Sequence, residues 1–316
     1  MRLLHIQDDG NLSLVEFFED DTPPYAILSH TWGPDNEEVS YRDLVEGTGI
    51  QKRGRGKIAF CARQAASDNL KHFWVDTCCR SVCRYLLTGW LPAVVDKSSS
   101  AELTESINSM FQWYKKAVVC CVLLEDLASG TALDVALGDG FSRCRWFTRG
   151  WTLQELLAPK LVEIFNKAWV YVGTKSDHAV AISQLTRIPT EVLLNKTDIL
   201  RVPIAERMSW ASNRQTKRKE DIAYCLLGIF DVSMPLIYGE GEKAFRRLQE
   251  EIIKHSNDLT IFMWDAALGN SANVPTYVGI LAKSPVQFAN SADITLLLYN
   301  DANPEFSLTN KGLFLK

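Results

Sequence analysis

The sequence has no long hydrophobic run, and none approaches the roughly 18 consecutive apolar residues that span a bilayer. The N-terminus becomes acidic at Asp8 and Asp9, too early for the apolar core of a secretory signal peptide. Basic residues are not in excess, because 34 Lys and Arg stand against 38 Asp and Glu, for a net charge of -4. These absences predict a cytoplasmic protein with no membrane span and no nucleic-acid partner.

Internal repeats, low-complexity linkers and the paired cysteine spacing of a zinc site are also missing. The eight cysteines include two adjacent pairs, Cys78-Cys79 and Cys120-Cys121. In a reducing compartment such cysteines are mostly small buried hydrophobic residues. With 316 residues, 47% of them hydrophobic, the chain predicts a globular protein of one large or two ordinary domains.

Strand and helix patterns alternate through the first half of the chain. Apolar runs predict strands at residues 2–6, 12–18, 25–29, 73–77, 117–124 and 161–165. Helical spacing predicts helices at about 56–69, from Ser99 to Tyr114, and at about 150–158. This alternation predicts an α/β fold with a mostly parallel sheet flanked by helices. Its functional site is expected at the carboxyl ends of the strands.

The pattern changes after the strand that ends near residue 165. Helical stretches are expected at about 176–186, 203–212, 219–230 and 241–256, and the chain beyond Asn257 has a β-rich pattern that stops in mid-strand. We therefore expect three parts: a first domain over 1–170, a helical segment over 171–256, and a β-rich, truncated region over 257–316.

The stretch Arg149–Leu156 carries the most informative spacing. Trp151 and Glu155 are four residues apart, so a helix would place them on one face. An aromatic wall beside a desolvated carboxylate can bind a flat cationic ligand and stabilise a developing positive charge. The structural alternative is a capping box, in which Thr152 caps the helix and Glu155 reaches back to its first amide.

Several sequence blocks resemble the HET domain, the heterokaryon incompatibility family of filamentous fungi. They are residues 25–33 (YAILSHTWG), 74–79 (WVDTCC), 96–103 (DKSSSAEL) and 149–159 (RGWTLQELLAP), and they cover a core of about 25–160. Residues 208–211, 218–231 and 235–245 are similar to the segment that usually follows this domain. The resemblance implies a role in nonself recognition (vegetative incompatibility), as an effector of programmed cell death.

The HET family is thought to be distantly related to TIR domains, some of which cleave NAD. The resemblance therefore implies a TIR-like or flavodoxin-like sheet, and residues 151–156 match the Trp-x-x-x-Glu-Leu spacing of the TIR site. The nicotinamide of NAD leaves as a neutral group, so its departure needs no general acid. A single Glu155 can stabilise the oxocarbenium-like centre, whereas ordinary glycoside hydrolysis uses two carboxylates. On this model NAD is a substrate, and neither a metal nor a cofactor is required.

On the same model, Glu155 is the catalytic residue of a candidate NAD glycohydrolase. Trp151 or Trp32 would stack the nicotinamide or adenine, and Asp76 would orient water or a ribose hydroxyl. The loop Ser29, His30, Thr31, Trp32 and Gly33 would face the phosphates or ribose. Each assignment has a structural alternative: the tryptophans as core residues, Asp76 as a turn cap, and His30 bonded to backbone.

Three other interpretations use the same loops. A cysteine enzyme would take Cys78 or Cys79 as nucleophile with His30 and Asp76. A zinc site would need Cys78, Cys79 and Cys83, although adjacent cysteines ligate one ion poorly. The main rival is a non-enzymatic signalling module that acts by self-association or by binding other incompatibility proteins.

One segment departs from the family pattern. About 15 residues, 80–94, separate Cys79 from Val95-Asp96, where the family pattern joins the two blocks almost directly. A retained short intron in the gene model is our hypothesis, because the segment falls cleanly between motif halves. A genuine loop insertion near the site is the alternative.

Overall fold

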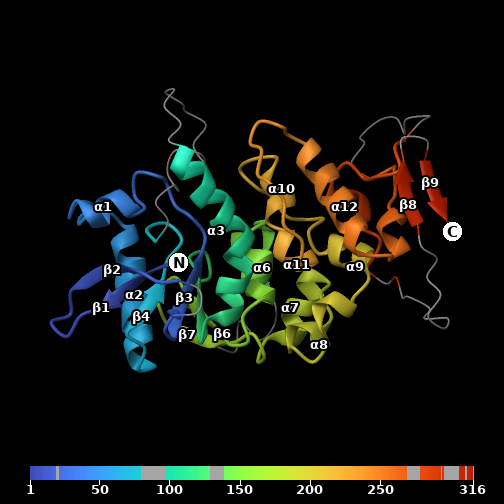
Figure 1. The fold of residues 1–316 in the computed structure, drawn as a ribbon. Helices are drawn as coiled ribbons and strands as arrows, with labels where there is room; N and C mark the ends of the chain where they lie inside the picture. The colour runs from blue at the N-terminus through green and yellow to red at the C-terminus, as the bar shows by residue number, and fades with distance from the viewer. Residues whose placement is uncertain are drawn as a thin grey trace. The chain divides into compact units, whose positions relative to one another are not determined.

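The computed structural model describes residues 1–18, 21–79, 97–128, 139–268, 278–292, 294, 306–309 and 312–315. Two compact units form, one from Met1–Phe147 with Gln154–Leu185 and the other from Thr148–Leu153 with Thr186–Lys316 (Figure 1). The predicted boundaries at 170 and 256 stay predictions. The proposed insertion at 80–94 lies outside the described residues.

A seven-stranded sheet forms the centre of the first unit, in the order β2-β1-β4-β3-β5-β6-β7. Its strands are β1 (Arg2–Ile6), β2 (Leu12–Glu16), β3 (Tyr25–His30), β4 (His72–Trp74), β5 (Val119–Leu124), β6 (Val162–Asn166) and β7 (Tyr171–Thr174). The four strands β4-β3-β5-β6 are parallel, and the outer pairings are antiparallel. The predicted α/β fold is confirmed.

The parallel strands follow the order 2-1-3-4 when they are numbered along the chain. Strand order therefore reverses between the first strand, β3, and the third, β5. In open α/β sheets, ligands bind in the crevice outside the carboxyl ends of the strands at such a reversal. Every residue of β3 and β5 is buried, as expected for strands covered on both faces.

Helices connect these strands or follow the last of them. They are α1 (Tyr41–Val45), α2 (Gly54–Ser67), α3 (Lys97–Lys116), α5 (Asp139–Ser142), η2 (Arg145–Thr148), α6 (Thr152–Leu157) and α7 (Ala179–Thr186). On α2 the buried positions Ile58, Cys61 and Ala65 recur at helical spacing and form the predicted apolar stripe.

Helix α2 covers one face of the sheet. Its Phe60 contacts Phe165 of β6, with the ring centroids 4.8 Å apart. The strand register aligns Phe165 with Leu123, and Leu123 with His30. His30 therefore belongs to the face that α2 covers.

Helix α3 covers the opposite face. Its Trp113 and Tyr114 contact Trp74 of β4 at centroid distances of 5.8 and 5.9 Å, and Trp74 is in register with Ile27. Successive residues of a strand point to opposite faces, so Ser29 shares the face of Ile27. The side chains of Ser29 and His30, at the end of β3, thus lie on opposite faces of the sheet.

The second unit is mostly helical. Its elements are α8 (Thr190–Leu193), η3 (Ile199–Arg201), α9 (Ile204–Ser209), α10 (Asp221–Tyr224), α11 (Leu227–Phe230), α12 (Lys243–His255), η4 (Leu259–Phe262) and η5 (Pro285–Phe288). An antiparallel pair, β8 (Phe306–Thr309) and β9 (Gly312–Leu315), follows. Asp258 accepts a hydrogen bond from the amide of Ile204 (2.8 Å) and so satisfies a free N–H at the start of α9. Within the described ranges, no helix has the length and apolarity to cross a membrane.

Candidate functional site

The carboxyl end of β3 brings polar side chains into the interior. Ser29, His30 and Thr31 are 0%, 5% and 1% exposed. Buried polar groups at this depth need hydrogen-bond partners, because an unsatisfied one costs about 1–3 kcal/mol. Their partners come from elements far away in the sequence.

Ser29 joins β3 to α6 through Glu155. The Ser29 hydroxyl donates a short hydrogen bond to Glu155 Oε2, and it accepts one from Trp146 Nε1 at 2.8 Å. Glu155 is 7% exposed. The carboxylate predicted to be catalytic therefore points to the carboxyl end of the central strand and is held there by a hydroxyl that is itself fixed.

Tyr114 of α3 is a further member of this group. Its hydroxyl donates to the carbonyl of Leu28 at 3.2 Å. Burial raises the pKa of Tyr114 well above its ordinary value, and the nearby carboxylates of Glu155 and Asp76 raise it further. The phenol therefore stays protonated and remains a hydrogen-bond donor.

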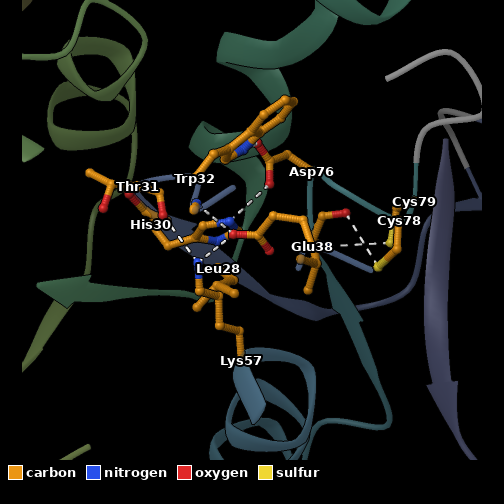
Figure 2. A network of polar contacts seen from close by, with 12 residues as sticks. Leu28, His30, Thr31, Trp32, Glu38, Lys57, Asp76, Cys78 and Cys79 are labelled. Carbon is orange, nitrogen blue, oxygen red and sulfur yellow. Dashed lines mark hydrogen bonds and ion pairs between the residues drawn. The ribbon is translucent and has the colours of Figure 1, made fainter. Parts of the chain in front are cut away.

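On the other face, His30, Trp32 and Asp76 form a second group (Figure 2). The indole N–H of Trp32 donates to Asp76 Oδ2, and His30 Nε2 lies 3.7 Å from Asp76 Oδ1. The side chain of Asp76 is 21% exposed, whereas that of His30 is 1% exposed. Solvent or a ligand therefore reaches Asp76 more easily than His30.

A buried lysine lies beneath the same loop. Lys57 of α2 donates to Glu38 Oε1 at 2.6 Å and to the carbonyl of Thr31 at 3.1 Å (Figure 2), and it lies 3.2 Å from Glu125 Oε1. Glu38 also accepts from the amide of Gly33 at 2.8 Å. The ammonium thus fixes the backbone of the β3 loop and links it to the end of β5.

Gly54 allows α2 to begin beside this carboxylate. A Cβ at Gly54 would lie 2.8 Å from Glu38 Oε2 and 2.9 Å from the backbone nitrogen of Val39. The amide of Gly54 also donates to the carbonyl of Glu37 at 2.8 Å. A side chain at this position would force α2 away from the lysine's main partner.

A cavity of about 220 Å³ opens at the reversal of strand order, between the loops that follow β3 and β5. It is lined by Gly33, Pro34, Glu37, Glu38, Arg53, Gly54, Lys57, Glu125, Asp126 and Arg145. Of the predicted site residues, Gly33 lines this cavity. Ser29, Trp32 and Asp76 are outside its lining, as are His30 and Glu155.

Trp151 makes its contacts in the second unit. Burial raises the pKa of Asp221 above its ordinary value, and hydrogen bonds from Tyr238 and Trp151 oppose that rise. The Tyr238 hydroxyl is 2.9 Å from Asp221 Oδ1. The indole of Trp151 is thus engaged with Asp221, while Glu155 four residues later is engaged with Ser29.

The cysteines beside the site are buried. Cys78 and Cys79 are 0% and 3% exposed, and burial raises the pKa of the Cys78 thiol well above its ordinary value. A thiol in this environment is a poor nucleophile, which argues against the cysteine-enzyme interpretation. In the part of the chain that the structure describes, no group of three or more His, Cys, Asp or Glu has a metal-binding arrangement. Cys83 lies outside that part.

Glu38, Lys57, Tyr114, Glu125 and Trp146 were not predicted as site residues. Lys57 carried a usable signal, because it precedes Phe60 and Cys61 by three and four residues and so falls on the apolar stripe of a helix. A lysine in that position is rarely buried without a partner. Trp146 and Glu125 carried no such signal, since their partners lie more than 60 residues away in the sequence.

A comparison with known proteins agrees with the resemblance to fungal incompatibility proteins. The chain is similar to the vegetative incompatibility protein HET-E-1 of Podospora anserina, with 47% identity over 263 residues that cover 80% of this chain and 18% of that protein. Residues 243–311 match a family described as a domain of unknown function, DUF8212. No solved structure matches the chain. The chain spans less than a fifth of the length of its relative, and their similarity supports a relation to fungal incompatibility proteins.

Proposed function

We propose that this chain is an effector module of fungal vegetative incompatibility, and that it triggers cell death by cleaving NAD or a related nucleotide. Its similarity to HET-E-1 over four fifths of its length supports the biological role. The chemistry rests on the chain's own residues, above all on Glu155.

The contact between Ser29 and Glu155 carries the chemical proposal. It holds a carboxylate at the carboxyl end of β3, the strand beside the reversal of strand order. Glu155 is 7% exposed, so its charge acts through a medium of low dielectric. A fixed carboxylate in such a place stabilises a developing positive charge better than solvent does.

In the proposed reaction the bond between ribose C1' and the nicotinamide nitrogen breaks, and both electrons leave with nicotinamide. The positive charge that develops at C1' is stabilised by Glu155. Water then adds to C1' and releases a proton, which gives ADP-ribose. Asp76, the more exposed acid near His30, would orient that water or a ribose hydroxyl.

The cavity between the β3 and β5 loops suits the phosphates of such a substrate. Arg53, Lys57 and Arg145 line it together with Gly33 of the loop that is expected to face phosphate. Lys57 is already engaged with Glu38, and Arg145 lies 3.6 Å from Asp126, so the exposed guanidinium group of Arg53 is the better phosphate contact.

A non-enzymatic module is the second candidate, and the same contact favours it. Glu155 is buried and bound to Ser29, which in turn binds Trp146. A carboxylate in this position also serves to fasten α6 to the sheet. On this alternative the chain acts by assembling with itself or with other incompatibility proteins.

Nicotinamide release by the purified protein separates the two candidates. Glu155→Gln keeps the shape of the side chain and removes its charge, and Glu105→Gln is a matched change at an exposed position of α3. We expect the wild type and E105Q to release nicotinamide from NAD, and E155Q to lose at least about 99% of that activity, as is usual when a key electrostatic group is removed.

A thermal melt of each variant accompanies the assay. If E155Q melts with the wild type and both proteins release nicotinamide equally slowly, the hydrolase proposal fails and the assembly module is favoured. If E155Q releases nicotinamide as fast as the wild type, Glu155 is not the reactive carboxylate.

A further inference from the structure

The second unit contains a cavity of its own, with a volume of about 660 Å³. Its walls come from the segment before α10, from the start of α12 and from the segment that leads into η5. The lining residues are Arg214, Gln215, Thr216, Lys217, Lys219, Ile222, Glu242, Leu268, Lys283, Ser284 and Gln287. The volume is within the range of about 300–1,000 Å³ that small-molecule sites occupy.

The charge of this lining is strongly positive, although the whole chain carries a net charge of -4. Arg214, Lys217, Lys219 and Lys283 face a single carboxylate, Glu242. Lys219 and Glu242 are themselves paired at 3.3 Å, with side chains 73% and 69% exposed. Together the four cations outnumber the carboxylate and give the cavity a field that concentrates anions.

Arg214 is the rigid cation of the group. It is 6% exposed, and its Nη1 donates to the carbonyl of Arg149 at 2.8 Å and to Thr152 Oγ1 at 3.0 Å. Its Nε donates to the carbonyl of Trp210 at 3.3 Å. A guanidinium held at this many points loses little entropy when it meets a ligand.

Gln287 adds a buried neutral donor. It is 4% exposed, and its amide oxygen accepts from the backbone N–H of Lys283 at 2.6 Å. No residue within the described ranges accepts a hydrogen bond from its amide nitrogen. That N–H group is therefore available to an acceptor in the cavity, such as a phosphate oxygen.

The wall that carries Arg214 is fixed in place. Gln215 donates to the carbonyl of Thr148 at 2.7 Å and accepts from the amide of Gly150 at 2.9 Å. A Cβ at Gly150 would lie 2.5 Å from the methyl group of Thr216, so this close approach requires glycine. This wall of the cavity is thus in place before any ligand arrives.

We propose that this cavity binds a small phosphorylated molecule whose phosphate groups meet Arg214, Lys217, Lys283 and Gln287. Ile222 and Leu268 provide an apolar wall for the rest of the ligand, which favours a nucleotide over a bare phosphate. The site is independent of the carboxylate chemistry at Glu155, and the second unit contains all of its residues.

Calorimetric titration of the purified chain with ADP, inorganic pyrophosphate and adenosine tests the proposal. We expect ADP to bind most tightly, pyrophosphate more weakly and adenosine not measurably. The double variant K217Q/K283Q should weaken ADP binding by about tenfold or more, because it removes two cations from the lining. The matched double variant K167Q/K196Q removes two exposed lysines that are outside the cavity and should bind ADP like the wild type.

Three outcomes would overturn the proposal: no binding of ADP or pyrophosphate at millimolar concentration, adenosine binding as tight as ADP binding, or an equal loss in both double variants. Two exposed lysines were chosen so that the fold is retained, and a thermal melt checks this. Arg214→Gln serves as a further variant, with its loss of affinity interpreted only if it melts with the wild type.

Discussion

At the carboxyl edge of the sheet, the buried ammonium of Lys57 lies against two carboxylates. Lys57 is 2.6 Å from Glu38 and 3.2 Å from Glu125. In the cavity of the second unit, four cations meet one carboxylate, and that carboxylate belongs to an exposed pair. The first arrangement holds loops in position, whereas the second is suited to an anion from outside the chain. The comparison predicts that removing a charge from the ion pairs of Lys57 affects stability, and that removing a charge from the second cavity affects ligand affinity.

Lys57→Met should have the largest effect on stability. It keeps most of the packing volume but leaves Glu38 and Glu125 without their cation, which should lower the free energy of unfolding by about 3 kcal/mol. Urea denaturation measures the change. Lys219→Met, which breaks an exposed pair, should cost less than about 0.5 kcal/mol. An equal loss of unfolding free energy in Lys57→Met and Lys219→Met would contradict the difference between the two regions.

The buried side chain of Lys175 should make the stability of the first unit depend on pH. Burial lowers the pKa of Lys175 to about 8, and its ammonium donates to the carbonyls of Leu156 and Pro159 at the end of α6. Between this pKa and the ordinary value of 10.5, the unfolded chain binds more protons than the folded chain. Stability should therefore rise across that window.

Between pH 8 and pH 10, the free energy of unfolding of the wild type should rise by on the order of 2 kcal/mol relative to that of Lys175→Met. Thermal melts of both proteins at the two pH values measure this difference. Lys196→Met changes an exposed lysine and should keep the wild-type dependence. A wild type and K175M with the same pH profile would mean that Lys175 is solvated.

Ser29→Ala should destabilise the protein by about 1–2 kcal/mol, because both Glu155 and Trp146 lose a buried hydrogen bond. Ser67→Ala changes an exposed serine at the end of α2 and is the matched control. Thermal melts of the two variants give the difference. If S29A is as stable as S67A, Ser29 does not anchor the carboxylate.

Glu242→Gln should have the smallest effect and the opposite sign. It removes the one carboxylate from the lining of the basic cavity, so ADP affinity should rise by about twofold. Calorimetric titration at low salt measures this change. An unchanged affinity at 20 and 200 mM salt alike would indicate that charge does not govern binding there.

Hydrophobic periodicity predicted six of the seven strands of the sheet. The strands at 2–6, 25–29 and 161–165 and the helix at 241–256 correspond to β1, β3, β6 and α12. The short edge strand β7 was not predicted, since its four residues include Gly173 with a φ of +143° and give no alternation. A pattern this short and irregular carries little information about pairing.

The candidate site was predicted in part for a different reason. Motif resemblance led to Ser29, Asp76 and Glu155, and the structure joins Ser29 to Glu155 across 126 residues of sequence. The partner Trp146 and the lysine Lys57 depend on tertiary contacts between distant elements, which local spacing does not encode. Which face of the sheet Ser29 and His30 each lie on can also be assigned only when the register of β3 is known.

The most direct test of the central claim is a paired measurement of NAD content and viability in hyphae that express the wild type or Glu155→Gln at matched protein levels. The account predicts that NAD falls and the hyphae die with the wild type and not with E155Q, while both proteins melt at the same temperature. Hyphae that lose NAD and die equally with a folded E155Q would contradict it.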